Sequence, residues 1–381
     1  MLLVGAAGHI GMADDAMRSA EMFKIERVSR HVYAAIAQTN PVVNGNSAII
    51  VTEKGLVVVD SQSYPFAAHS LYSQFTREVK DLPVRYLINT HHHLDHAHGN
   101  AAYAKMFGSQ LDIISTDFSR TALEQASRWF SAFLDGRPEA PAQIQAVSRQ
   151  EMYYAFLQAY IGSLRDEIPA IDTRLAGLNG EKRAAELNRA NALRTYFSEM
   201  SGFVPALPNL TFNHDLRLHC GDVTIELLFL GRGHTAGDAV VFVPEDRVVV
   251  TGDLVHGLDP LLMEAYPDEW PITVGKVAEL DFDSLVPGHG PVQHGRAMLT
   301  LFKDYLTELN QLVKEGVTDG KNLVTLQSEV APERLHSLSN QDFGRMMQRN
   351  REELLGLSPG QPLSPVVRSE VEQIYNYYVR K

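Results

Sequence analysis

Four histidines and one aspartate are crowded into a single short stretch of this chain. They lie in residues 89–96 (NTHHHLDH), directly after the apolar segment 84–89, which we predict to be a β-strand. In an extended segment His91 and His93 project to the same side, whereas Asp95 and His96 follow the bend of the chain and can serve a second centre. Imidazole and carboxylate are the ligands that zinc accepts where no thiolate is available. The stretch therefore predicts a metal site at the end of a strand.

Three later motifs also place ligand-type residues directly after predicted strands. They are GHTAGD at 233–238, TGD at 251–253 and PGHG at 287–290. The small residues in each motif let the backbone come close to a neighbouring group. Loops that gather at one end of a sheet are where functional sites assemble, so we expect these motifs to join the histidine cluster.

The rest of the chain predicts layered sheets covered by helices. Before residue 116 we predict strands at 23–28, 32–37, 48–51, 56–59, 84–89 and 111–115, with helices at 65–80 and 100–107. After residue 205 we predict strands at 210–218, 223–230, 238–243, 247–250 and 285–286, a helix at 271–279 and helical structure from 293 onward. This succession of strands and helices is typical of an α/β layered fold.

Residues 117–205 have few β signals and many helix formers. Apolar residues recur at helical spacing in two stretches, around Trp129–Phe133 and Tyr153–Ile161. Such aromatic residues either pack helices against one another or roof a substrate pocket, and the sequence leaves both readings open.

The composition excludes several classes of protein. The chain has 381 residues, 45% of them hydrophobic and 21% charged, which is enough for one large or two modest domains. Its formal net charge of -12 disfavours binding to nucleic acid. The single cysteine, Cys220, allows no internal disulfide and is expected to be a small buried residue at a strand end. No apolar run reaches the length of a membrane span, so the expected partner is a small-molecule substrate, with no nucleic acid and no membrane.

The start of the chain favours a cytoplasmic location, because it lacks the basic residues that open a signal peptide. If the weakly apolar residues 1–8 are the remnant of such a peptide, the location is periplasmic or extracellular instead.

Taken in this order, the motifs H-x-H-x-D-H, G-H-T-x-G-D, T-G-D and P-G-H-G resemble those of the metallo-β-lactamase superfamily. The resemblance runs from about residue 24 to about residue 295, apart from the helical segment. It implies an α/β fold of the αββα sandwich type. It divides the chain into an N-terminal tail (1–22), the metallo-β-lactamase-like domain (23–116 and 206–295), a helical insertion (117–205) and a C-terminal helical region (296–381).

The resemblance also implies a role for individual residues. Seven positions match the family's metal ligands: His91, His93 and His234 for a first metal ion, Asp95, His96 and His289 for a second, and Asp253 as the carboxylate that bridges both. Asp60 and Asp238 resemble residues that orient a ligand or its loop. The expected cofactor is two zinc ions per chain, with iron or manganese as alternatives.

Four other histidines lie close to the motifs. His92 and His98 stand outside the matched positions, and we expect no direct role for them. His256 and His294 follow Asp253 and His289 closely, and each either faces substrate or lies in a solvent-exposed loop.

The implied chemistry is hydrolysis. Two zinc ions sharing a water lower its pKa from about 15.7 towards about 7, which gives a hydroxide that attacks a carbonyl or phosphoryl centre. Asp95 is the expected catalytic residue, because it can bind metal and also orient the nucleophile or accept its proton.

The type of residue at position 253 differs between subfamilies of the metallo-β-lactamase superfamily. β-Lactamases of the superfamily typically carry Cys or Ser there, so Asp253 more resembles the glyoxalase II, lactonase, esterase and nuclease relatives. The leading expectation is hydrolysis of an ester, thioester or lactone. A β-lactam hydrolase, a phosphodiesterase and a non-haem iron persulfide dioxygenase are the alternatives. The helical insertion either covers the metal site or forms a homodimer interface.

Overall fold

The computed structural model describes residues 22–38, 40, 42–134, 150–257, 260–340, 343–348 and 363–381. The predicted N-terminal tail lies outside these residues except for Met22. Among the described residues, no helix combines the length and apolar character that crossing a membrane requires.

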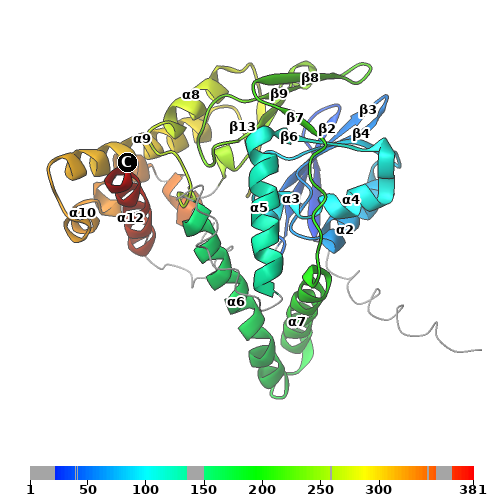
Figure 1. The fold of residues 1–381 in the computed structure, drawn as a ribbon, viewed down its shortest axis with the longest axis horizontal. Coiled ribbons are helices and arrows are strands. Elements are labelled where there is room, and N and C mark those ends of the chain that lie inside the picture. The colour runs from blue at the N-terminus through cyan, green and yellow to red at the C-terminus, as the bar shows by residue number, and fades with distance from the viewer. Residues whose placement is uncertain are drawn as a thin grey trace, which may run out of the picture.

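Two sheets face each other in the centre of the molecule (Figure 1). The first follows chain order: β1 (Phe23–Arg27), β2 (Val32–Ala37), β3 (Ser47–Thr52), β4 (Gly55–Val59), β5 (Val84–Ile88), β6 (Asp112–Thr116) and β7 (Leu210–Phe212). Its strands are antiparallel up to β4 and parallel from β4 to β7. The second runs β13 (Gln293–His294), β12 (Ser284–Pro287), β11 (Val248–Gly252), β10 (Val240–Val243), β9 (Thr224–Leu228) and β8 (Asp215–His219). Among the described strands of this second sheet, β11 and β12 pair in parallel, and the other neighbouring pairs are antiparallel.

Helices cover the outer face of each sheet. The first sheet carries α2 (Pro65–Glu78) and α4 (Asn100–Phe107), and the second carries α8 (Trp270–Glu279) and α9 (Ala297–Thr318), with α12 (Ser364–Arg380) packed against α9. Shorter helical elements lie between these strands and helices along the chain. They are α3 (Leu94–Ala97), α10 (Leu323–Glu329) and the 3₁₀ turns η1 (Gly108–Gln110), η3 (Pro244–Asp246), η4 (Asp253–Val255), η5 (Pro332–Arg334) and η6 (His336–Ser339). The predicted αββα sandwich is therefore confirmed.

Strand β4 shows how the sequence specifies these layers. All five of its residues, Gly-Leu-Val-Val-Val, are buried, as expected for a strand covered on both faces. Val57 and Val59 point into the core between the sheets, whereas Leu56 and Val58 pack under the helices. This alternation follows from the two-residue period of a strand.

Two predictions at element boundaries were wrong. The segment 210–218 is not one strand, because β7 pairs with β6 in the first sheet and β8 pairs with β9 in the second. Both halves have β-type residues, and strand propensity does not say which sheet a strand joins. The helix expected from Gln293 begins only at Ala297, after β13 and a turn at Gly295, whose φ is 70°.

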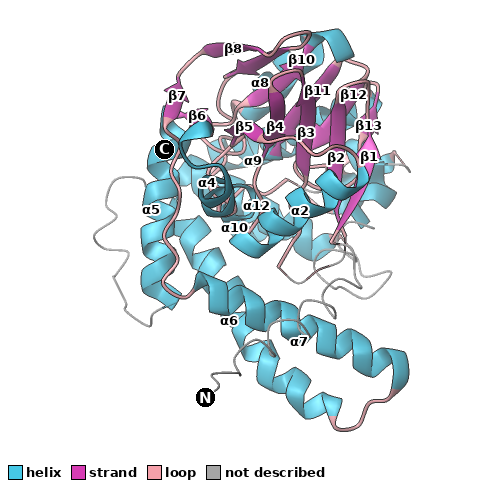
Figure 2. Ribbon diagram, turned by 90° about the vertical axis from the view of Figure 1, so that its right-hand side faces the viewer, coloured by secondary structure: helices cyan, strands magenta, loops and turns pink. Residues whose placement is uncertain are grey.

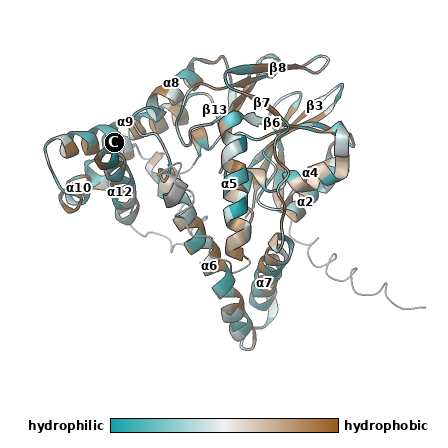
Figure 3. Ribbon diagram, in the orientation of Figure 1, coloured by the Kyte–Doolittle hydropathy of each residue, from teal (hydrophilic) through white to brown (hydrophobic). Residues whose placement is uncertain are grey.

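Three helices leave the sandwich after β6 and return the chain at β7. They are α5 (Asp117–Leu134), α6 (Gln150–Leu175) and α7 (Gly180–Met200). Figures 1 and 2 show α6 and α7 as a hairpin that projects away from the sheets, and Figure 3 shows hydrophilic and hydrophobic residues alternating along it. Ion pairs join the two helices, including one between Arg189 Nε and Glu167 Oε1 at 2.5 Å. The free cysteine, Cys220, is buried just after β8, as predicted.

Candidate metal centre

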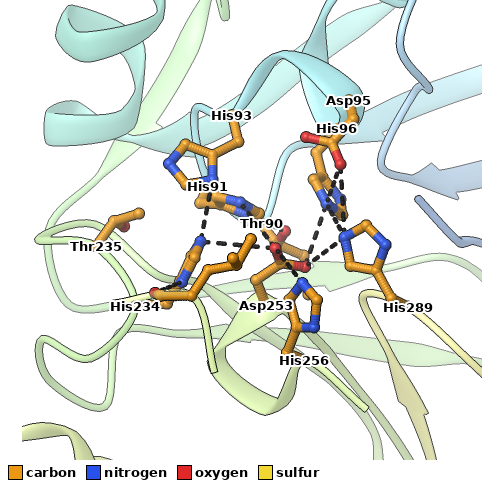
Figure 4. Close-up of polar contacts among 12 residues, drawn as sticks. Thr90, His91, His93, Asp95, His96, His234, Thr235, Asp253, His256 and His289 are labelled. Atoms are coloured by element: carbon orange, nitrogen blue, oxygen red, sulfur yellow. Dashed lines mark hydrogen bonds and ion pairs between the residues drawn. The ribbon is translucent and has the colours of Figure 1, made fainter. Parts of the chain in front are cut away.

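The seven predicted ligands meet at one end of the sandwich (Figure 4). They come from loops and turns that follow strand ends: His91 and His93 after β5, Asp95 and His96 in α3, His234 between β9 and β10, Asp253 after β11, and His289 after β12. All are buried except Asp95, whose side chain is 26% exposed. The structure therefore brings the predicted set together.

The first group surrounds His234. Its Nε2 lies 3.0 Å from His93 Nδ1 and 3.5 Å from Asp253 Oδ2. The third histidine, His91, places Nε2 3.8 Å from the same Asp253 oxygen. These four residues offer ligand atoms that all lie within 4.8 Å of one another, as the ligands of one metal ion do.

The second group lies on the other side of Asp253 (Figure 4). Asp95 Oδ2 is 3.5 Å from His289 Nε2 and 3.6 Å from His96 Nε2. Asp253 Oδ1 is 3.2 Å from His96 Nε2 and 3.4 Å from His289 Nε2. One oxygen of Asp253 thus faces the first group and the other faces the second, which is the arrangement of a bridging carboxylate.

Two glycines let the chains come this close. A Cβ added at Gly252 would lie 2.2 Å from Thr90 Oγ1, and one added at Gly288 would lie 1.9 Å from Asp253 Oδ1. Gly252 also has a φ of 51°, which favours glycine. The small residues of the TGD and PGHG motifs therefore allow Asp253 to sit between the two groups.

Asp60 orients a ligand of the second group. Its carboxylate accepts hydrogen bonds from the Thr90 backbone N–H and hydroxyl, both at 2.8 Å. Asp60 Oδ2 also lies 2.9 Å from His96 Nδ1, so that His96 Nε2 is left to face Asp253. Asp60 itself has a φ of 63°, an uncommon value for a residue with a side chain. The structure therefore places Asp60 behind the imidazole of His96.

Asp238 acts on the loop of His234 rather than on a ligand. Its buried carboxylate accepts hydrogen bonds from the Thr235 backbone N–H at 3.0 Å and from the Thr235 hydroxyl at 2.5 Å. Burial raises the pKa of Asp238 to about 7, although the hydrogen bonds from Thr235 act in the opposite direction.

The electrostatics favour the forms that bind metals at His91 (neutral imidazole) and at Asp253 (ionised carboxylate), whereas at His96 they favour the protonated imidazole, which must lose its proton to bind a metal. Burial holds the pKa of His91 well below its usual range. Burial would raise the pKa of Asp253, but the surrounding imidazoles, first that of His289, hold it well below its usual range. Burial would lower the pKa of His96, yet the nearby carboxylates, first that of Asp253, raise it well above its usual range.

The donor set fits two adjacent metal ions. Buried polar atoms in proteins nearly always have hydrogen-bond partners, yet His91 Nε2 and Asp253 Oδ1 have none. Both atoms point into the groups described above. Imidazole nitrogens with carboxylate oxygens are the ligands that zinc, iron and manganese accept.

Glu264 was missed by the sequence analysis. It is buried in the loop before α8, and its Oε1 lies 2.7 Å from His93 Nε2 and 3.0 Å from His92 Nε2. The surrounding imidazoles hold the pKa of Glu264 well below its usual range, against the effect of burial. No motif surrounds Glu264. The sequence offered only a general signal: an imidazole that binds a metal through one nitrogen needs a partner for its other nitrogen.

The other histidines take different positions. His256 is buried beside Asp253, with Nε2 3.5 Å from Asp253 Oδ2, so it is not a solvent-exposed loop residue. His294 is exposed and contacts Ser284 at 3.0 Å. His98 is buried 3.3 Å from Ser127 Oγ, and burial lowers its pKa to about 3.

The helical insertion reaches the first group through α6. The ring of Tyr153 stacks on His93, with centroids 4.0 Å apart and planes at 15°. Its hydroxyl accepts a hydrogen bond of 3.2 Å from the Leu94 backbone N–H. The ring of Trp129 stacks on those of Phe133 and Tyr154, so these aromatic residues pack the helices of the insertion against one another.

Comparison with known proteins agrees with this geometry. Residues 40–289 match the family model of the metallo-beta-lactamase superfamily. Metallo-beta-lactamase type 2 of Bacillus sp. (strain 170) is 26% identical over 125 residues, which are 31% of this chain and 48% of that protein. The corresponding enzyme of Elizabethkingia meningoseptica is 27% identical over 129 residues, 31% of this chain and 49% of that protein. The chain thus spans about half the length of the curated relatives it matches.

Among solved structures, the stereoselective inverting sec-alkylsulfatase Pisa1 from Pseudomonas sp. has a similar fold. Its TM-score is 0.56 at 13% sequence identity, and the match covers 94% of this chain and 50% of that one. This likeness concerns the fold alone.

Proposed function

Because the chain belongs to the metallo-β-lactamase superfamily, we propose that it is a metal-dependent hydrolase that cleaves a carboxylic ester, thioester or lactone. The observation that carries this proposal is the position of Asp253 between two complete ligand groups. Zinc is the proposed metal at both positions, held by His91, His93 and His234 on one side and by Asp95, His96 and His289 on the other. When bound, the metals supply Lewis-acid chemistry and lower the pKa of water.

Asp95 is the proposed proton acceptor. Unlike the other six ligand-type residues, it is partly exposed, so its carboxylate can meet both solvent and substrate. Its Oδ2 stays within 3.6 Å of His96 and His289. A carboxylate in this place can bind, orient the attacking water and hold its proton during attack on a carbonyl carbon.

The remaining residues hold these groups in place. Asp60 and Glu264 fix the rings of His96 and His93 through their second nitrogens. Such carboxylate–histidine pairs fix the ring orientation and raise the basicity of the ligand. Asp238 fixes the loop that carries His234 through its bonds to Thr235.

The substrate class rests on Asp253 and on charge. An aspartate at this position favours ester, thioester or lactone cleavage over β-lactam cleavage within the superfamily. The net charge of -12 disfavours nucleic-acid substrates. β-Lactam hydrolysis is the second candidate, because the matching curated relatives are named metallo-beta-lactamases.

The helical insertion is proposed to cover the site and to favour an uncharged or weakly charged substrate. The stacking of Tyr153 on His93 supports this role. A homodimer through the same helices remains a proposal, which sedimentation analysis of the purified protein would test.

A substrate panel tests the proposal directly. Purified protein loaded with zinc is given p-nitrophenyl esters, a thioester, lactones, a chromogenic cephalosporin, a secondary alkyl sulfate and bis-p-nitrophenyl phosphate. We expect the highest kcat/KM on one of the carboxylic substrates. Faster turnover of the cephalosporin, sulfate or phosphodiester would reassign the reaction, and oxygen consumption with a persulfide would exclude hydrolysis as the main activity.

A further inference from the structure

A short segment just before β3, residues 44–46 (Asn-Gly-Asn), lies beside the second ligand group. The carbonyl oxygen of Asn44 accepts a hydrogen bond of 2.9 Å from His289 Nδ1. Because a carbonyl oxygen can only accept, this nitrogen carries a proton, and Nε2 is left to face Asp95 and Asp253. The segment therefore orients the ring of one ligand-type residue.

The glycine in the middle of this segment brings it close to α3, which carries the other two histidine and aspartate ligands of the group. A Cβ added at Gly45 would lie 3.0 Å from the Asp95 carbonyl oxygen and 3.5 Å from His96 Nε2. A side chain here would press on both residues. Residues 44–46 thus contact all three residues that, with Asp253, make up the second group.

The side chain of Asn46 holds the loop that carries His289. It is buried, and its amide nitrogen donates hydrogen bonds to the carbonyl oxygens of Pro287 at 3.0 Å and Gly290 at 2.8 Å. The Asn46 backbone N–H donates a third bond, of 2.7 Å, to the Gly288 carbonyl oxygen. These acceptors lie on both sides of His289 in the chain, so Asn46 fixes the backbone from which the ring extends.

The partners of the Asn46 side chain require an amide in one orientation. Its Oδ1 accepts a hydrogen bond of 3.2 Å from the Ala37 backbone N–H at the end of β2. Turning the amide over would set Oδ1 against two carbonyl oxygens and the NH₂ group against an N–H. A carboxylate of the same shape could accept from Ala37 but could not donate to either carbonyl of the loop.

A second buried amide fixes the segment from the other side. Gln62 Nε2 donates to the Gly45 carbonyl oxygen at 2.9 Å and to Ser47 Oγ at 2.8 Å. The Ser47 hydroxyl in turn donates to the Asp60 carbonyl oxygen at 2.7 Å, and the carboxylate of Asp60 contacts His96. Both imidazoles of the second group are therefore attached to one hydrogen-bonded network at the start of β3 and the end of β4.

We infer that Asn46 is a positioning residue of the second metal position, an inference that rests on the proposed two-metal function. Its hydrogen bonds hold the loop of His289 against the carbonyl that orients the ring, which keeps His289 Nε2 beside Asp253. In the first group, by contrast, His93 is held by Glu264 and Tyr153. Loss of the two Asn46 side-chain donors should therefore weaken one metal position and spare the other.

Stepwise zinc titration of metal-free protein, followed with a chelating dye, tests this inference. Asn46→Leu and Asn46→Asp keep the approximate size of the side chain and remove both donors, and only the second adds a charge. His289→Ala identifies the titration step that belongs to the second position. Asn322→Leu is the matched control: Asn322 caps α10, in the C-terminal helical region, by accepting a hydrogen bond of 3.0 Å from the Thr325 N–H.

We expect the zinc affinity of the second position to fall about 10–100-fold in both Asn46 variants, with the affinity of the first position unchanged. Asn322→Leu should lower thermal stability through the loss of a helix cap, yet bind both zinc ions as the wild type does. If either Asn46 variant, shown to be folded by circular dichroism, keeps both wild-type affinities, Asn46 is a packing residue and the inference is wrong. Equal losses at both positions would also overturn it, because they would show general damage to the fold.

The wild-type titration separates this inference from the proposed function. If wild-type protein binds fewer than two zinc ions, the two-metal proposal itself fails. If it binds two, and a folded Asn46 variant binds two with the same affinities, only the role of Asn46 fails.

Discussion

The two ligand groups on either side of Asp253 are held by different parts of the molecule. In the first group, His93 is held by Glu264 from the loop before α8 and by Tyr153 from the helical insertion. In the second group, His96 is held by Asp60, directly after β4, and His289 by a backbone carbonyl just before β3.

This difference shows that the second group belongs to the sandwich itself, whereas the first also depends on segments outside it. A substitution in the loop or the insertion should therefore act on the first metal position. A substitution at a strand end should act on the second. Asp253 turns one carboxylate oxygen to each group, so its replacement should damage both positions together.

The largest effect is expected from Asp253→Asn. Replacing one carboxylate oxygen by an amide removes the anionic bridge, so both metal positions weaken and kcat/KM falls by about 10³-fold or more. Steady-state kinetics and metal content measure this. His92→Ala, which removes a histidine outside the ligand groups, should change activity much less. Equal losses in the two variants would mean that the division into ligands and neighbours is wrong.

The matched pair Glu264→Gln and Asp60→Asn tests the comparison itself. Each removes the charge of a carboxylate behind one ligand, so each should weaken one metal position by about 10–100-fold. The loss should fall on the first position for Glu264→Gln, which frees His93, and on the second for Asp60→Asn, which frees His96. Stepwise zinc titration with a chelating dye measures both affinities. If both variants lost zinc affinity at the same metal position, the two ligand groups would not be supported separately, and the comparison would be wrong.

A smaller effect is expected at Tyr153. Tyr153→Ala removes a stacking contact worth about 0.5–1.5 kcal/mol, so kcat/KM ratios between substrates should change on the order of tenfold or less. The ranking of substrates should change more than the metal content. Tyr153→Phe keeps the ring and loses only the contact with the Leu94 N–H, so it should stay closer to the wild type. An unchanged ranking in Tyr153→Ala would leave the insertion as structure or interface.

The smallest effect on the site is expected from Asp246, at the far end of β11. Its buried carboxylate accepts hydrogen bonds from the His31 backbone N–H at 2.7 Å and contacts His31 Nδ1 at 2.8 Å. Burial would raise the pKa of Asp246, but these bonds and one from the Ser29 hydroxyl lower it below its usual value.

A lowered pKa gives stability that is present above the unfolded-state pKa and is lost as pH falls through the folded-state pKa. Asp246→Asn should therefore cost about 1–2 kcal/mol of unfolding free energy at neutral pH. The difference from the wild type should shrink below about pH 4. Urea unfolding at several pH values measures it. A change in metal content would contradict the separation of the two ends of the sandwich.

The fold, and the meeting of the seven ligand-type residues at one end of the sandwich, could be predicted because their signals are local. His91 and His93 follow an apolar strand at once, and Asp253 and His289 stand beside the glycines that let loops approach. Each motif could be read within a few residues, and the order of the motifs supplied the rest.

Glu264 and His256 could not be predicted in the same way. Glu264 contacts His93 across 171 residues of sequence, from a loop without any repeated pattern. His256 stands one turn after Asp253, but the sequence does not say whether that turn buries it. The division of residues 210–218 into β7 and β8 could not be predicted either, because it depends on which sheet offers a free edge to each strand.

The central claim, a two-metal centre bridged by Asp253, is tested most directly by the metal content of active protein. Elemental analysis of purified, active wild-type protein should find about two equivalents of zinc per chain, because two complete ligand groups share one carboxylate. The parallel Asp253→Asn sample should hold fewer than two. A single tightly held iron in the wild type, together with oxygen consumption, would contradict the account.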